Sequence, residues 1–184
     1  MRPATVCALT LAYCMSQAVL ASATVLLPAD FPTVVAESGL IVRGRVADVT
    51  SSLAGPRHTI ESLVTVNVIE SYKGASGATV IFRVPNGQVG RYRRIIVGAP
   101  EFERGDEVVV FLRGRAPAIP TLFGLSQGVY RVMRDAAARA VVVPVPVAAQ
   151  GPGTERVVRG DPMRRPVPVE TFAREVRALL ERNR

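Results

Sequence analysis

Two long stretches in the first half of the chain alternate between hydrophobic and polar residues. They are LIVRGRVADV (40–49) and HTIESLVTVNVIESY (58–72). Alternation with a period of two residues is typical of a β-strand with one covered face, so each stretch predicts a half-buried strand. Leu63 and Ile69 break the alternation in the second stretch, which indicates a β-bulge or a change of covered face.

Shorter apolar runs follow, and turns rich in glycine and proline separate them. The run EVVVFLRG (107–114) is almost entirely apolar, so we expect a central strand that is covered on both faces or closed within a barrel. The remaining strands are expected at 79–84, 92–97, 122–133 and 137–145. Many short strands with such turns predict a mainly β fold, a small OB-like barrel of about six or seven strands.

Helical patterns lie on either side of the barrel sequence. Asp30 is expected to start a short helical turn that runs to Glu37 and ends at Gly39. The stretch PVETFAREVRALLERNR (168–184) predicts one C-terminal amphipathic helix, because its apolar residues form a single stripe. This stripe consists of Val169, Phe172, Val176, Leu179 and Leu180. We expect the stripe to pack on the barrel, with an outside partner as the alternative.

Residues 1–23 have the pattern of a secretory signal peptide. A short basic start precedes a mostly apolar run at 6–20, and ASA (21–23) supplies small residues for cleavage near Ala23. The apolar run is short for a membrane span, and no later segment reaches spanning length. We therefore expect an exported protein, periplasmic or secreted. The alternatives are a buried N-terminal helix, an uncleaved anchor, or a lipoprotein site at Cys14.

The predicted cleavage leaves a mature chain without cysteine, because Cys7 and Cys14 are the only cysteines. Without disulfides the mature chain needs a sufficient hydrophobic core, and its length allows one domain of that kind. We expect the β-barrel domain at 24–144, a linker rich in Pro, Gly and Arg at 145–167, and the C-terminal helix at 168–184.

The chain is basic, with 23 Lys and Arg residues against 15 Asp and Glu residues and a formal net charge of +8. Basic residues are scattered apart from RYRR (91–94) and RR (164–165). This distribution predicts a solvated basic surface, with attraction to anionic polymers or lipid head groups as the alternative. Nucleic acid is disfavoured as a partner, because single-strand binding uses exposed aromatic residues, and these make up only 5% of the chain.

Side chains suited to catalysis are few. His58 is the only histidine. GLSQG (124–128) matches the G-x-S-x-G pattern of hydrolases, but those enzymes place a helix after the turn and a His after the Ser. Lys73, the only lysine, precedes Gly74 and is expected to be an exposed charge at a strand end rather than a nucleophile. We therefore predict no enzyme activity, no cofactor and no metal site.

A binding face is expected where the basic cluster meets the loop 98–106. Within that cluster, an aromatic residue is interleaved with three arginines. The predicted residues are Arg91, Tyr92, Arg93, Arg94, Glu101 and Phe102. The expected partner is a protein or an anionic component of the cell envelope.

Four segments form a recognisable series: LIVRGRV (40–46), VIESYKG (68–74), FERGDEVVVFL (102–112) and GVY (128–130). The series resembles a group of exported, functionally uncharacterised bacterial proteins with the pattern V-x-G-x-V…Y-K-G…F-x-x-G-[DE]-E-V-V-x-F-L…G-x-Y. It is more distantly similar to the OB-fold barrel of tissue inhibitors of metalloproteinases and netrin-like domains. The resemblance rests on turn glycines and strand pattern, so it implies a fold rather than an activity.

The resemblance to metalloproteinase inhibitors implies the barrel without the inhibitory chemistry. Those inhibitors engage the zinc of the enzyme through an N-terminal cysteine, and the expected mature chain has no cysteine. We predict a non-enzymatic binding or structural module that acts at or outside the cell envelope. The alternative, which the fold resemblance alone suggests, is an inhibitor of an extracellular or periplasmic protease.

Overall fold

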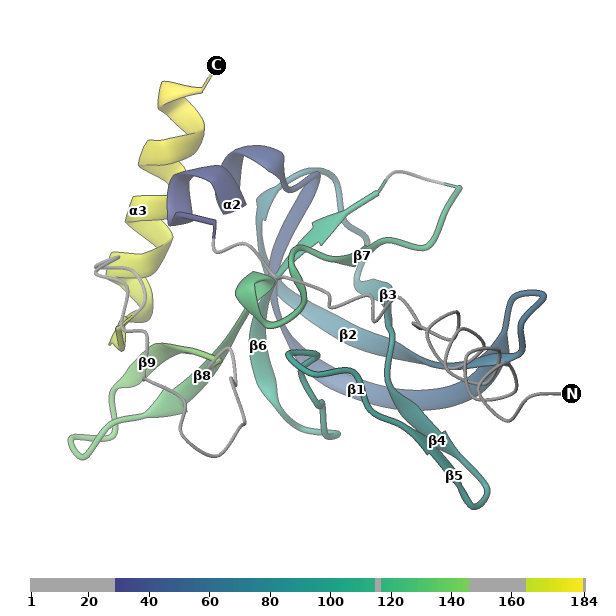
Figure 1. Cartoon of the computed structure of the whole chain (residues 1–184). Helices are drawn as coiled ribbons and strands as arrows, with labels where there is room; N and C mark the ends of the chain where they lie inside the picture. Colours follow the sequence, from purple (N-terminus) through teal and green to yellow (C-terminus); the bar gives the residue numbers. More distant parts are fainter. Residues whose placement is uncertain (1–28, 115–116, 146–164, 184) are drawn as a thin grey trace, which may run out of the picture.

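The computed structural model describes residues 29–114, 117–145 and 165–183. They form a mainly β fold with a small closed barrel and one C-terminal helix, which confirms the predicted fold class (Figure 1). The predicted signal peptide, with its cleavage near Ala23, and most of the predicted linker 145–167 lie outside the described residues.

Five strands close the barrel. In spatial order they are β1 (Leu40–Ala54), β2 (Thr59–Lys73), β3 (Thr79–Val84), β7 (Thr121–Leu122) and β6 (Glu107–Arg113), and β6 also pairs with β1. β3 and β7 run parallel, whereas the other neighbouring strands of the barrel are antiparallel. This closed arrangement of five strands is that of an OB-like barrel.

The hairpin of β1 and β2 is longer than the barrel wall. Both strands have 15 residues, but β1 pairs with β6 only from Leu40 to Arg45. The ladder between β1 and β2 continues to the pair Ala54 and Thr59. The far half of this hairpin therefore extends beyond the point where the barrel closes.

The pairing of β1 and β2 shows where the alternation of β2 breaks. Arg43 pairs with Glu70 and Gly44 pairs with Val68, so the register skips Ile69. The bulge expected at Ile69 is confirmed. The break expected at Leu63 is wrong, because Leu63 stays in register and its neighbours remain alternately buried.

Strand β6 separates two hydrophobic cores, which explains its apolar run. Val108, Val110 and Leu112 face the interior of the barrel. Val109 and Phe111 face the opposite side, toward the second core. A strand covered on both faces needs apolar residues at every position.

The second core lies between the sheet and the helices α2 (Phe31–Glu37) and α3 (Val169–Arg182). Phe172 of α3 packs against Phe31, Phe111 and Tyr130, with ring centroids 5.4, 6.3 and 5.0 Å away. Since Ile41 and Phe111 come from barrel strands, the helices and the barrel share one core.

Helix α2 follows the boundaries expected from the sequence. Asp30 is its N-cap, and the carboxylate accepts a hydrogen bond from Thr33 N at 2.8 Å. Hydrogen bonds from the side chain and backbone of Thr33 lower the pKa of Asp30 below its usual value. At the other end Ser38 Oγ donates to Val34 O, and Gly39 N donates to Leu112 O.

The strands expected at 92–97, 122–133 and 137–145 differ in their bounds from the observed strands. The strand expected at 92–97 ends at Arg94. The stretch 122–133 divides into β7, a 3-10 turn at Leu125–Gly128 and β8 (Val129–Arg134). β8 extends the sheet from β6 and pairs with β9 (Ala140–Pro144). The end of the expected linker is structured, because β10 (Val167–Pro168) pairs with β9.

Candidate functional site

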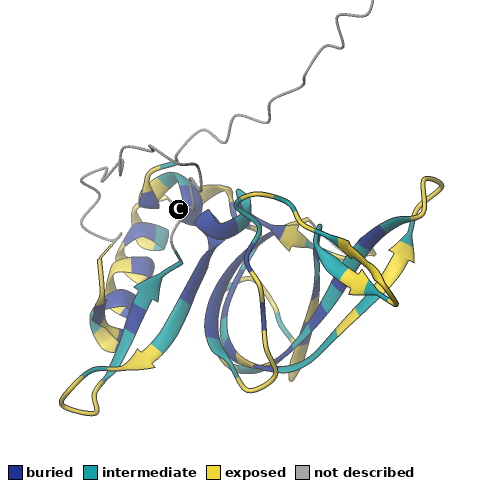
Figure 2. Ribbon diagram, turned by 60° about the horizontal axis from the view of Figure 1, so that its bottom comes forward, coloured by how far each residue is buried: buried dark blue, intermediate teal, exposed yellow. Residues whose placement is uncertain are grey.

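A small hairpin projects from the barrel at the end opposite α3 (Figures 1 and 2). Its strands are β4 (Gly87–Val89) and β5 (Tyr92–Arg94), which form a two-stranded sheet of their own. The turn between them is Gly90-Arg91, and Gly90 has a φ of +57°. Glycine adopts such positive φ values without steric cost.

The β4–β5 hairpin is fixed to the far half of the β1–β2 hairpin. Gln88 N donates to Ser51 Oγ at 3.2 Å, and Ser62 Oγ donates to Asn86 O at 2.6 Å. Gly87 has a φ of +151°, and a Cβ there would lie 2.5 Å from both serine oxygens. The close approach therefore requires glycine, and it holds the hairpin in one position.

The three arginines of the hairpin have different surroundings. Arg93 forms an ion pair of 2.5 Å with Glu101, and both side chains are exposed. Arg94 is half-buried and donates to Ile60 O at 3.3 Å. Arg91 donates to Tyr92 Oη at 2.9 Å, and its guanidinium lies 5.1 Å from the centroid of that ring. Arg91 and Arg93 are therefore the arginines that a partner could reach.

Apolar side chains lie open to solvent in the same part of the chain. Tyr92 is 61% exposed, Ile95 is 68% exposed and Val97 is 75% exposed. These are the three most exposed large hydrophobic residues in the described part of the chain. Residues 91–97, called the 91–97 segment below, therefore combine reachable arginines with uncovered apolar surface.

One residue of the predicted binding face is buried, and two residues outside the prediction are exposed beside it. Phe102 is only 9% exposed and packs edge-on against Phe82 inside the barrel, 5.4 Å between ring centroids. It is not available to a partner. Ile95 and Val97 were missed, because their apolar character predicted a covered strand. The fact that β5 ends at Arg94 leaves them uncovered.

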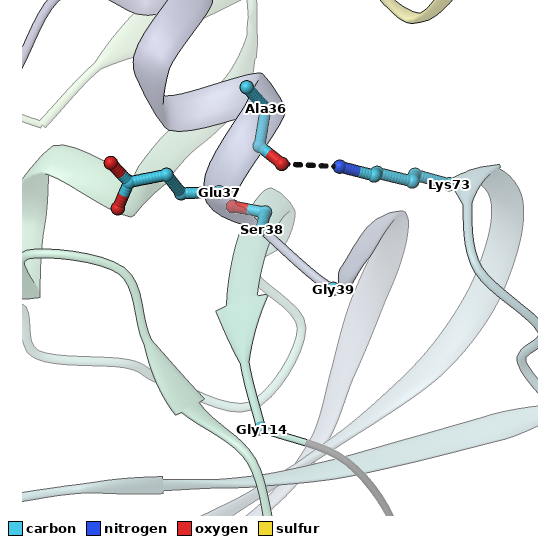
Figure 3. A pocket seen from close by; sticks show the side chains of 6 residues that line it. All are labelled: Ala36, Glu37, Ser38, Gly39, Lys73 and Gly114. Atoms are coloured by element: carbon cyan, nitrogen blue, oxygen red, sulfur yellow. Dashed lines mark hydrogen bonds between the residues drawn. The ribbon is translucent and has the colours of Figure 1, made fainter. Parts of the chain in front are cut away.

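Lys73 has a different role from the one expected. Its ammonium donates to Val35 O and Ala36 O, both at 2.8 Å, at the C-terminal end of α2. Figure 3 shows the bond to Ala36. Cations are favourable at that end of a helix, where carbonyl groups lack partners. Burial lowers the pKa of Lys73. The lysine is thus a helix cap rather than a free charge at a strand end.

A hollow of about 330 Å³ lies beside this cap. Its lining residues are Ala36, Glu37, Ser38, Gly39, Lys73 and Gly114. The carboxylate of Glu37 points away from Lys73 in Figure 3 and pairs with Arg113 instead. Since the charged groups at the hollow already have partners, we do not place a ligand there.

Replacing Lys73 by Met is expected to lower the free energy of unfolding by about 1 kcal/mol. The methionine keeps the apolar stem but leaves the carbonyls of Val35 and Ala36 without their donor. Urea unfolding followed by circular dichroism measures the difference. Arg174→Met is the control on the exposed face of α3, and an equal effect of the two changes would contradict the cap.

The G-x-S-x-G match does not form a nucleophile turn. Ser126 is only 2% exposed and lies in the 3-10 turn Leu125–Gly128, with its N–H donating to Gly98 O at 3.1 Å. A Cβ on Gly128 would lie 2.6 Å from Phe123 O, so this glycine permits a close backbone approach. The motif therefore serves local packing.

Two acidic residues at the start of β6 have arginine partners. Glu107 pairs with Arg43 at 2.6 Å and with Arg45 at 3.0 Å, and Asp106 pairs with Arg131 at 2.7 Å.

Within the described residues, no group of three His, Cys, Asp or Glu side chains could hold a metal ion. No helix of the described chain is long and apolar enough to cross a membrane.

Comparison with known proteins leaves the fold and the site as the basis for function. The chain matches no family model, no curated protein and no solved structure at the level required for significance. The resemblance to exported bacterial proteins and to netrin-like barrels stays a prediction.

Proposed function

We propose that the chain is an exported, non-enzymatic binding module that acts at or outside the cell envelope, with the 91–97 segment as its contact surface. The observation that carries this proposal is the exposure of Tyr92, Ile95 and Val97. Covering apolar surface is favourable, and arginine and tyrosine are enriched at contact surfaces. Tyr92 and Arg91 supply both kinds of side chain at one turn.

Hydrogen bonds hold the base of the β4–β5 hairpin, which favours binding without a rearrangement of its backbone. Ser51 and Ser62 hold its base, and Asn86 Nδ2 donates to Pro100 O at 3.0 Å. A contact surface that is already ordered loses less conformational entropy when a partner binds. The 91–97 segment passes through this fixed base, because Arg94 pairs with Gly87.

The side chains that could suggest catalysis have structural roles. Ser126 is buried, Lys73 caps α2, and Glu107 is held by two arginines. These positions support a binding role over an enzymatic one.

Photo-crosslinking tests the proposed contact surface. A photoreactive residue at position 92 of the full-length protein is expected to capture envelope components, lipid or protein, in the native host. The same residue at position 133, which is exposed on the β8–β9 hairpin at another end of the molecule, is the control (Figure 1). Equal capture, or no capture, at the two positions would contradict the proposal.

The captured component also decides on the second candidate. Capture of a peptidase, with near-stoichiometric loss of its activity, would favour the protease inhibitor suggested by the fold resemblance. No contact among the described residues favours a protease inhibitor over a binding module.

A further inference from the structure

We propose that the partner of the 91–97 segment is the surface of a lipid bilayer that contains anionic phospholipid, which rests on the contact surface proposed above. Two separate features of the segment point to this chemistry. One is the exposed aliphatic and aromatic side chains, and the other is the guanidinium groups beside them.

The apolar residues match the interfacial layer of a bilayer. Ile95 and Val97 are more exposed than any other large hydrophobic residue of the described chain. Peripheral proteins bury such side chains at the boundary between head groups and acyl chains. Tyr92 adds an amphipathic ring, and tyrosine is enriched at this depth of the membrane.

The charges match anionic head groups. Arg91 contacts Tyr92 and has no carboxylate partner among the described residues, so its charge is available to a phosphate. Arg93 is held only by Glu101, in an ion pair whose side chains are 55% and 69% exposed. Such exposed pairs are weak, so a phosphate can replace the carboxylate. Arg57 at the tip of the neighbouring β1–β2 hairpin is also exposed.

The β1–β2 hairpin adds apolar surface on the side that carries β4. Leu53 is 54% exposed and lies two residues from Ser51, so both point to the same face of β1. Ser51 is the residue that holds Gln88 of β4. Leu53 therefore adds an exposed apolar side chain on the face of β1 to which β4 is bound.

The shape favours a bilayer over a protein groove. The β4–β5 hairpin carries Arg91, Tyr92 and Arg93 and projects from the barrel (Figures 1 and 2), and Ile95 and Val97 follow it in the chain. A projecting surface can enter the head-group layer without a complementary pocket. An acidic protein would have to supply a groove that fits Tyr92, Ile95 and Val97. The experiment below distinguishes a bilayer from an acidic protein as the partner.

Vesicle co-sedimentation of the exported protein, purified in the form that its native host produces, tests the proposal. Vesicles of equal parts phosphatidylcholine and phosphatidylglycerol are compared with vesicles of phosphatidylcholine alone. The protein is expected to partition at least about tenfold more strongly to the anionic vesicles, and added salt should weaken this binding.

Two double variants separate the two contributions. Arg91→Gln with Arg93→Gln is expected to weaken binding about 25-fold, roughly fivefold for each arginine near an anionic surface. Ile95→Ser with Val97→Ser is expected to weaken binding by about tenfold or more. The matched control is Met133→Ser with Arg134→Gln on the β8–β9 hairpin, where one exposed apolar residue again lies beside an arginine. This control should bind like the original protein.

Because all the substituted residues are on the surface, unfolding in urea is expected to show that the variants fold. Two results would overturn the lipid proposal. One is equal partitioning of the protein to vesicles with and without phosphatidylglycerol. The other is a loss of binding in the control variant as large as the loss in the two test variants. Failure on vesicles together with crosslinking from position 92 to an acidic protein would overturn the lipid proposal and leave the contact surface standing. Failure of both experiments would overturn both.

Discussion

Phe172→Ala is expected to lower the free energy of unfolding by about 3–5 kcal/mol. Phe172 is fully buried, and its ring packs against Phe31, Phe111 and Tyr130. These residues come from α2, β6 and β8, so the truncation opens a cavity where four elements meet. The surroundings cannot collapse into it, because β6 is held by its pairing with β1. Equilibrium urea unfolding measures the loss.

Glu175→Ala on the exposed face of the same helix is the control for this prediction. Substitutions at such surface positions usually change stability by less than about 0.5 kcal/mol. A loss below about 1 kcal/mol for Phe172→Ala would mean that α3 does not unfold together with the barrel.

Gly44→Val is expected to destabilise the barrel by about 3 kcal/mol, because no side chain fits at this position. Gly44 lies between two neighbours, Val68 of β2 and Val108 of β6. A Cβ on Gly44 would overlap Val66 Cγ1 and the backbone oxygen of Asn67. The backbone of β2 would have to move, which disturbs the closure of the barrel.

Gly77→Ala is the matched control, since a Cβ at Gly77 would meet no atom closer than 3.9 Å. Thermal and urea unfolding of both variants give the comparison. If Gly44→Val were as stable as Gly77→Ala, the close contact of β1 and β2 would not be needed for closure.

The fold was predictable from the sequence to the extent that it depends on local pattern. The alternation in β1 and β2 and the apolar run of β6 each indicate how many faces of a strand are covered. Asp30 marks the start of α2, because a capping carboxylate acts within one turn. The pairing that closes the barrel, between β1 and β6, joins residues far apart in the chain and leaves no local sign.

The candidate site was predictable only in part for the same reason. The cluster of arginines around Tyr92 is visible as a run of charge. Ile95 and Phe102 are both apolar residues next to polar ones, yet one is exposed and the other lies in the barrel core. Lys73 precedes a turn in the sequence, and only the fold brings α2 to its ammonium. Which neighbours cover a residue is a tertiary property.

The second core also has a consequence for the order in which the protein folds. Phe31 stands near the beginning of the described chain, and Phe172 stands near its end. A nascent chain cannot complete this cluster until α3 has been synthesised. Until then Phe31, Phe111 and Tyr130 lack their central neighbour. Contacts of such long sequence separation slow folding, so this second core should form late, after the local hairpins of the barrel.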